Sequence, residues 1–337
     1  PSADKTLTMK MISRRDALKF GAIAGGALLL PIGLQTKSYA GDAGSPKVTP
    51  FSMPFKVPPV LSPVRSDATT DYYQIKVNKA RVSILPGLTS EVFSYNGSIP
   101  GPTIVQRQGR QSVVRFINDS IGTPTSTHLH GMASLPQYDG YAEDLIFPRA
   151  ATLWYHDHAI HKTAPNVYKG LAGLYLVKDD FEAGLNLPSG AYDVPLLLKD
   201  MIFGADGTVI YDDQGQKSLM GDVITVNGVP WPRMEVANRK YRFRLCNGSV
   251  SRSYRLALSN GAKFTMIGTD AGLMGAPVDV ADFRIGMAER YEFVIDFSKY
   301  PVGTQIVLKN LQPSNNINYD GTDIVMRFDV VRKEADS

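Results

Sequence analysis

Cysteine is almost absent from this 337-residue sequence, which contains only Cys246. A single cysteine excludes an internal disulfide framework and a cysteine-rich metal site. Charge of one sign is not concentrated anywhere, because 36 Lys and Arg and 32 Asp and Glu residues are scattered and leave a formal net charge of only +4. We therefore expect no nucleic-acid partner. With 43% hydrophobic and 20% charged residues, the composition also excludes a disordered or fibrous protein.

Long hydrophobic runs are missing except near the start of the chain. There, residues 13–19 (SRRDALK) precede an apolar run at 20–32, and the small-residue sequence Ser-Tyr-Ala follows at 38–40. The run is too short to span a bilayer, and its glycines weaken it as a helix. The layout is typical of a twin-arginine export signal. We expect a signal peptide at residues 1–40, a periplasmic or extracellular location, and no stable membrane anchor after cleavage.

Helical patterns are also scarce, and turn residues separate short apolar runs. Residues 41–57, rich in Pro, Ser and Val, are predicted to be a linker. Beyond it, β-branched and aromatic runs predict strands at 72–77, 80–84, 112–117, 171–177, 241–245, 253–258, 290–297 and 324–331. The Asn-Gly pairs at 96, 227, 247 and 260 and the Asp-Gly pairs at 139, 206 and 320 offer the positive φ angles of tight turns. The sequence therefore predicts an all-β fold of sandwiches.

An internal repeat predicts two domains. Segment 96–102 (NGSIPGP), followed by the strand at 113–118, recurs about 130 residues later as 227–232 (NGVPWP), followed by 241–247. We expect one sandwich at 58–180 and a second at 190–333. The alignment places Cys246 opposite Ile117, which predicts that this cysteine is a small buried core residue.

All five histidines fall within one short stretch of the first predicted domain. His128 and His130 form one His-X-His motif, and His156 and His158 form a second. Alternate side chains of a strand share a face, so two such strands would make a wall of four imidazoles. Imidazoles without a thiolate suit copper, zinc, iron or nickel, and copper binds nitrogen sites most tightly. A metal site is predicted, with copper preferred, whereas one isolated pair could equally lie on a surface strand.

The histidine motifs resemble the first two copper motifs of the multicopper oxidases, in particular the spore-coat laccase and bilirubin oxidase branch. The resemblance runs from residue 54 to residue 331, and it is carried by segments 127–131 (THLHG), 153–159 (LWYHDHA), 166–173 (NVYKGLAG), 192–197 (YDVPLL) and 288–291 (AERY). It implies tandem cupredoxin-like Greek-key β-sandwiches. It also implies a copper-dependent oxidoreductase that couples oxidation of phenolic, pigment or metal-ion donors to reduction of dioxygen to water.

The resemblance further implies a role for each motif residue. His128 would bind the type 2 copper of a trinuclear cluster, His130 and His156 one type 3 copper, and His158 the other. Asp139 matches an acidic residue that helps to protonate reduced oxygen species, although an Asp before Gly is equally a turn former. For His161, which stands outside both pairs, a local hydrogen bond, an exposed position and ligation all stay open.

Two further motifs of that family are absent. No His-Pro-X-His-X-His and no His-Cys-His segment follows His161, and Cys246 lies between Leu245 and Asn247. The resemblance therefore implies only the first two cupredoxin domains, with half of the trinuclear cluster ligands, no type 1 copper ligands and no third domain. Such a chain is expected to be inactive alone. The alternatives are an exported cupredoxin scaffold without catalysis and a copper-binding protein.

Overall fold

Strands dominate the computed structural model, which describes residues 44–119, 121–132, 149–212 and 219–334. The predicted signal peptide and Asp139 lie outside these residues. Within them, the α-helices are the short α2 (Thr163–Lys169) and α3 (Asp180–Ala183), and the 3-10 helices are η2 (Gly190–Tyr192) and η3 (Phe297–Lys299). In the described parts of the chain, no helix has the length and apolar character needed to cross a membrane.

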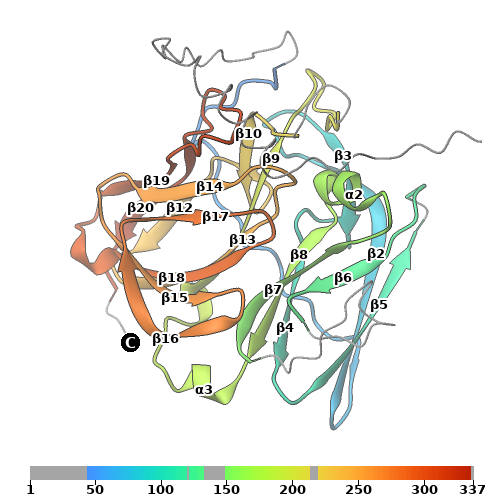
Figure 1. The fold of residues 1–337 in the computed structure, drawn as a ribbon, viewed down its shortest axis with the longest axis horizontal. Helices are drawn as coiled ribbons and strands as arrows, with labels where there is room; N and C mark the ends of the chain where they lie inside the picture. Colours follow the sequence, from blue (N-terminus) through green and yellow to red (C-terminus); the bar gives the residue numbers. More distant parts are fainter. Residues whose placement is uncertain (1–43, 120, 133–148, 213–218, 335–337) are drawn as a thin grey trace, which may run out of the picture. The chain divides into compact units, whose positions relative to one another are not determined.

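The first sandwich pairs two four-stranded sheets (Figure 1). One sheet contains β1 (Arg65–Ser66), β2 (Thr70–Val82), β3 (Ser90–Tyr95) and β5 (Gln111–Asn118). The other has the order β4-β8-β7-β6, made of β4 (Gly101–Arg107), β8 (Ala172–Lys178), β7 (Ala151–Asp157) and β6 (Thr127–His130). In β2, Tyr73, Ile75 and Val77 are buried between exposed residues, which is the period-two pattern of a strand with one face on a core.

The second sandwich has larger sheets. The seven-stranded sheet has the order β11-β10-β9-β13-β18-β15-β16, made of β11 (Val229–Pro230), β10 (Val223–Val226), β9 (Asp193–Met201), β13 (Lys240–Asn247), β18 (Arg290–Asp296), β15 (Phe264–Thr269) and β16 (Gly272–Val280). The five-stranded sheet has the order β12-β20-β19-β14-β17, made of β12 (Arg233–Ala237), β20 (Ile324–Arg332), β19 (Gln305–Asn310), β14 (Tyr254–Leu258) and β17 (Asp282–Ile285).

The two sandwiches repeat one topology. The order β4-β8-β7-β6 of the first corresponds to β12-β20-β19-β14 of the second, and β3-β2-β5 corresponds to β10-β9-β13. In each sandwich the same two pairs are parallel, namely β2–β5 and β4–β8 in the first and β9–β13 and β12–β20 in the second. Parallel pairs among antiparallel strands arise from the long connections of Greek-key sandwiches. The expected fold class of two tandem cupredoxin-like sandwiches is confirmed.

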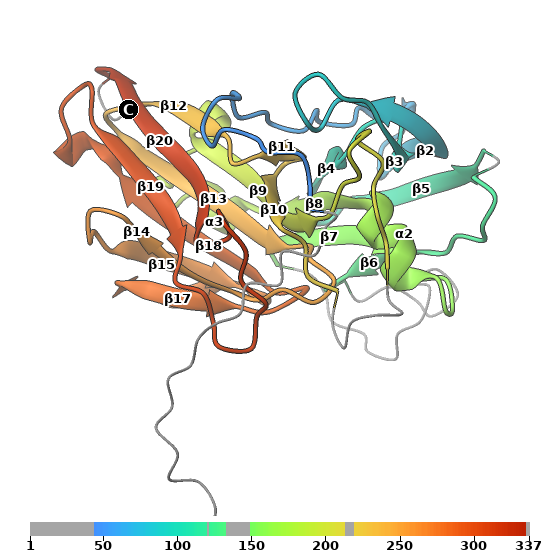
Figure 2. The same ribbon diagram turned by 90° about the horizontal axis from the view of Figure 1, so that it is seen from above.

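Strand β7 lies where the two sandwiches meet, as two perpendicular views show (Figures 1 and 2). All of its residues are buried, because one face packs on its own sandwich core and the other faces the second sandwich. Trp154 of β7 and Leu174 of β8 share a small apolar cluster with Leu197 of β9 and Cys246 of β13. Cys246 is fully buried, as the sequence predicted, and burial raises the pKa of its thiol.

Three local features differ from the sequence-based expectations. The runs at 72–77 and 80–84 form one continuous strand, β2. Asn247-Gly248 makes no positive-φ turn, because Asn247 ends β13 and its side chain accepts a hydrogen bond from the Ser249 N–H at 3.0 Å. Residues 44–57, expected to be a linker, hydrogen-bond to the second sandwich, where the Phe51 N–H donates to Trp231 O at 2.8 Å.

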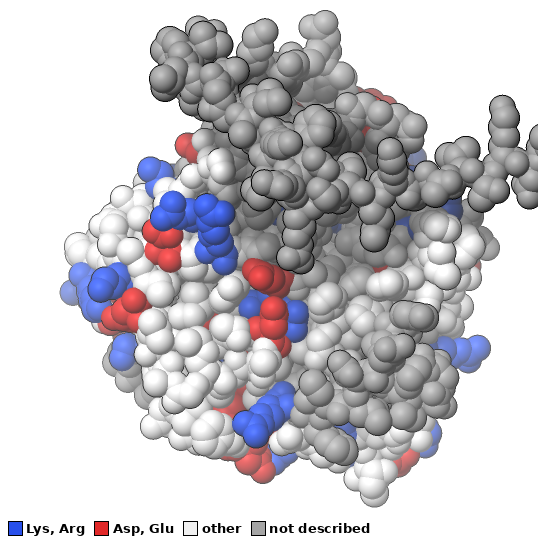
Figure 3. Space-filling view, in the orientation of Figure 1, with Lys and Arg blue, Asp and Glu red and all other residues white. Residues whose placement is uncertain are grey.

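Surface charge is mixed in sign. On the face drawn in Figure 3, the described Lys and Arg side chains lie beside Asp and Glu side chains. Exposed ion pairs such as Lys79–Glu91, at 3.3 Å, show the same mixture in β2 and β3. Among the residues visible there, no extended region carries a single sign of charge.

Candidate metal centre

Three histidines meet at the edge of the first sandwich. Strand β6 is the edge strand of its sheet and pairs antiparallel with β7, with His128 opposite His156 and His130 opposite Trp154. Residues opposite each other or two apart share one face of a sheet, so these side chains project together. The ring centroid of His128 lies 5.4 Å from that of His130 and 5.3 Å from that of His156. The pairing of two His-X-His motifs therefore produces the predicted imidazole cluster.

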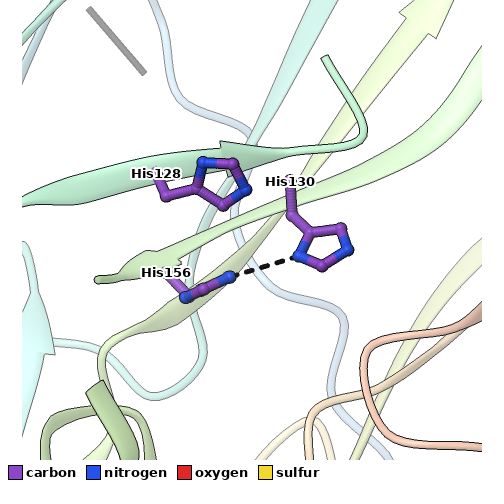
Figure 4. Close-up of side chains that lie close together, drawn as sticks. All are labelled: His128, His130 and His156. Carbon is purple, nitrogen blue, oxygen red and sulfur yellow. Dashed lines mark hydrogen bonds between the residues drawn. The ribbon is translucent and has the colours of Figure 1, made fainter. Parts of the chain in front are cut away.

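The ring nitrogens of this cluster are close enough to share one ion. One ring nitrogen from each of His128, His130 and His156 lies within 4.8 Å of the other two. Figure 4 shows His130 and His156 facing each other across the dashed line, with Nδ1 of His130 3.3 Å from Nε2 of His156. The other ring nitrogen of His156, Nδ1, lies 2.9 Å from the Asp157 carbonyl oxygen. A proton on Nδ1 donated to that carbonyl leaves the lone pair of Nε2 pointing into the cluster.

Burial keeps the imidazoles of His130 and His156 neutral. Burial, together with the charges of Arg290 and of the neighbouring histidines, lowers the pKa of His130 to about 3. For His156, burial lowers the pKa to about 4, and the carbonyl contact at Asp157 only partly opposes this. Histidine coordinates a metal through a neutral nitrogen, so both rings are in the binding form well below neutral pH.

His158 and His161 lie differently from the three clustered histidines. Strand β7 ends at Asp157, so His158 is outside it, and its backbone N–H donates to Ser126 O at 2.6 Å. Its ring centroid is still 5.3 Å from that of His128 and 5.8 Å from that of His156. His161 is exposed and has a φ of 60°. The structure thus gathers four imidazole rings, three of them with mutually close nitrogens.

A buried aspartate between two histidines holds the end of β7. The Asp157 side chain accepts hydrogen bonds from the Ser126 N–H at 2.8 Å, the Ala159 N–H at 3.2 Å and Nδ2 of Asn166 at 2.9 Å. Burial raises the pKa of Asp157, whereas these three donors lower it. Sequence analysis gave no role to Asn166 or Ser126. Only the alternation of side chains along a strand indicated that Asp157 points away from the neighbouring histidines and needs partners on the opposite face.

Two further groups bound the cluster. The Trp154 ring lies 4.2 Å, centroid to centroid, from the His156 ring and 5.4 Å from the His130 ring. From the second sandwich, the guanidinium of Arg290 reaches Gly131, the residue after His130. No motif spacing could predict this second contact, because Arg290 is distant in sequence and belongs to the other sandwich.

The side chains present fit a copper ion. Around an ion with metal–nitrogen distances of about 2.0–2.1 Å, two ligand nitrogens in tetrahedral geometry stand about 3.3 Å apart. The Nδ1–Nε2 separation of His130 and His156 is 3.3 Å. An all-imidazole donor set without carboxylate or thiolate is also one that copper binds well.

Comparison with known proteins agrees with this chemistry. Two family models described as "Multicopper oxidase" match residues 76–182 and 193–322. A bilirubin oxidase of Albifimbria verrucaria is 41% identical over 317 residues, covering 84% of this chain and 55% of that protein. A laccase of Bacillus stratosphericus is 34% identical over 331 residues, covering 82% of this chain and 65% of that protein.

A solved structure extends the likeness to three dimensions. The McoA multicopper oxidase of Aquifex aeolicus superposes with a TM-score of 0.75 at 30% identity, covering 86% of this chain and 67% of that one. The chain thus spans about half to two thirds of the length of the relatives it matches. From its two sandwiches, its histidine cluster and these likenesses, it follows that the chain belongs to the multicopper oxidase family.

Proposed function

We propose that this chain supplies one side of the dioxygen-reducing copper cluster of a laccase-like or bilirubin oxidase-like enzyme. The observation that carries the proposal is the facing pair His130 and His156, 3.3 Å apart between Nδ1 and Nε2, with His128 beside them. Family membership makes copper the expected metal. When bound, copper would supply the one-electron chemistry needed to reduce dioxygen.

Each histidine has a proposed share in holding the metal. His128 would hold the type 2 copper, His130 and His156 one type 3 copper, and His158 the other. His158 lies beyond the end of β7 and is not among the three histidines whose ring nitrogens lie within 4.8 Å of one another, which supports ligation of a different ion. Asp157 holds both flanking histidines in place through Ser126 and Asn166. A proton-donating role for Asp139 is part of the proposal and rests on its motif alone.

The proposed electron donors are phenols, pigments or metal ions. The bilirubin oxidase among the relatives supports a pigment donor by its name, whereas phenols and metal ions are proposed from the sequence resemblance alone. We also propose that the protein is exported through the twin-arginine pathway, on the basis of residues 13–40 of the sequence.

Copper binding by the full chain tests this proposal. We expect copper to bind with an electron paramagnetic resonance signal of nitrogen ligation, and the double substitution His128→Ala, His156→Ala to weaken binding by at least about 100-fold, since even outer groups of metal sites contribute 10–100-fold. His161→Ala is the matched control, because His161 is exposed and outside the cluster. If the double variant binds copper as tightly as the parent, the chain is better described as a cupredoxin scaffold without a metal site here.

A further inference from the structure

We propose that Arg290, on β18 of the second sandwich, is a positioning residue of the metal centre that also biases it toward the reduced ion. It would do so by bonding to the histidine strand β7 and by placing a buried positive charge beside Gly131, the residue after His130. The inference rests on the proposed function, because it concerns the metal that the histidines would hold.

The hydrogen bonds of Arg290 connect the second sandwich to the histidine strands. Its side chain is only 4% exposed, and Nε donates to the backbone oxygen of Thr152 in β7 at 3.1 Å. Nη1 donates to Ala288 O at 3.2 Å, and Nη2 donates to Asp270 O at 3.0 Å. A guanidinium held by three carbonyl oxygens has little freedom to turn, so its position relative to β7 is defined.

The same guanidinium lies close to the residue that follows β6. Gly131 follows His130 and has a φ of +88°, and a Cβ atom added there would stand 2.5 Å from Nη2 of Arg290. Such an approach is possible only because Gly131 has no side chain. Arg290 therefore bonds to β7 and lies against the glycine after β6, although it belongs to a different sandwich.

The charge of Arg290 acts mainly on the metal centre. Its carboxylate partner, Asp270, lies 2.7 Å from Nη1 but is 50% exposed, so water screens the acid more than the buried base. A buried cation beside a metal ligand destabilises the more highly charged oxidation state of the metal relative to the less charged one.

A purely structural clamp and a charge effect predict different measurements. Loss of a clamp weakens the binding of both ions and can also change the ratio of their dissociation constants, because Cu(I) and Cu(II) prefer different coordination geometries. A charge effect instead shifts this ratio in opposite directions when Arg290 and its partner Asp270 are neutralised in turn. The opposite shifts are therefore the result that decides, and they require no catalytic turnover.

The experiment measures Cu(I) and Cu(II) dissociation constants of the full chain by competition with chelators selective for each oxidation state. We expect Arg290→Met to shift the ratio in favour of Cu(II) on the order of tenfold, the size of effect that a unit charge exerts within a partly buried site. Arg290→Lys keeps the charge and should keep the ratio while weakening both affinities. Arg255→Met is the control, since Arg255 pairs with Asp282 in the other sheet of the second sandwich.

Asp270→Asn keeps the test decisive if Arg290→Met does not fold. Removing the acid leaves the guanidinium charge unopposed, so the ratio should move in the opposite direction, toward Cu(I). An unchanged ratio in Arg290→Met and Asp270→Asn, with copper still bound by the parent chain, would overturn this inference alone. Absence of copper binding by the parent chain would overturn the proposed function, and this inference with it.

Discussion

At the scale of single residues, glycines opposite one tyrosine set the position of the histidine strand. Tyr155, between Trp154 and His156, turns to the opposite face of β7, where its hydroxyl donates to Pro102 O at 2.6 Å. Its ring fills the space above Gly173, so a Cβ atom there would stand 2.4 Å from Cζ of Tyr155. The metal face of β7 therefore depends on packing at the back of the same strand.

Gly173→Ala should destabilise the protein by about 1–3 kcal/mol, the usual cost of overpacking a core. The added methyl group must displace either the Tyr155 ring or β8, because both lie in a filled interior. Urea unfolding measures the change. Gly275→Ala is the control, since Gly275 has an ordinary φ and open space around it. Equal stability of the two variants would contradict the packing argument.

At the scale of elements, a lysine of the second sandwich fixes helix α2. Nζ of Lys199, on β9, donates to the oxygens of Val167 and Tyr168 at 2.6 and 2.9 Å. These carbonyls lie in the last turn of α2, where a positive charge is favourable. Helix α2 carries Asn166, which holds Asp157. Lys199 of β9 therefore supports the histidine strand β7 indirectly, through helix α2 and Asp157.

Lys199 should make stability depend on pH. Burial lowers its pKa to about 7 in the folded state, from an ordinary value of 10.5. Below pH 7 the amine is protonated in both states, whereas between about pH 7 and 10 only the unfolded state keeps the proton, so stability rises with pH by up to about 1.4 kcal/mol per unit. Unfolding free energies of the parent and Lys199→Met, measured from pH 7 to 10, should therefore diverge in favour of the parent. Parallel curves would contradict this assignment.

At the scale of the whole described molecule, a buried charge network joins the sandwiches. Arg244 contacts Asp193 at 2.7 Å and Glu182 at 2.6 Å, and Arg242 pairs with Glu292. Glu292 also accepts a hydrogen bond from the Thr152 hydroxyl of β7 at 2.7 Å. These charged side chains are at most 7% exposed, so each depends on its partners for compensation.

Glu292→Gln should cost about 1.5–3 kcal/mol of unfolding free energy, because it weakens the charge-assisted hydrogen bonds that Glu292 accepts from Arg242 and Arg244. Calorimetry should show a lower melting temperature for this variant. Glu235→Gln provides the control, since Glu235 is an exposed residue of β12. A loss no greater than that of the control would show that the network does not stabilise the contact between the sandwiches.

The fold class and the gathering of the histidines were predictable from the sequence, whereas the residues that support the histidine strands were not. Strand runs, the repeat near Asn96 and Asn227, and the two His-X-His motifs depend on short-range periodicity, which a sequence displays directly. The prediction of a tight turn at Asn247-Gly248 was wrong, because an asparagine before glycine can also end a strand. There, the Asn247 side chain accepts a hydrogen bond from the backbone N–H of Ser249. No structural role was predicted for Arg290 or Lys199, because only the folded chain brings them to β7 and α2.

The sequence by itself determined two sandwiches, a buried Cys246 and one imidazole wall at His128, His130, His156 and His158. Only the tertiary structure decided that three of these rings converge while His158 lies beyond the strand, and that the second sandwich contributes Arg290 to the site. The physical reason is the separation along the chain of the residues involved. Strand alternation fixes which side chains share a face, but the distance between faces depends on how two separate cores pack against each other.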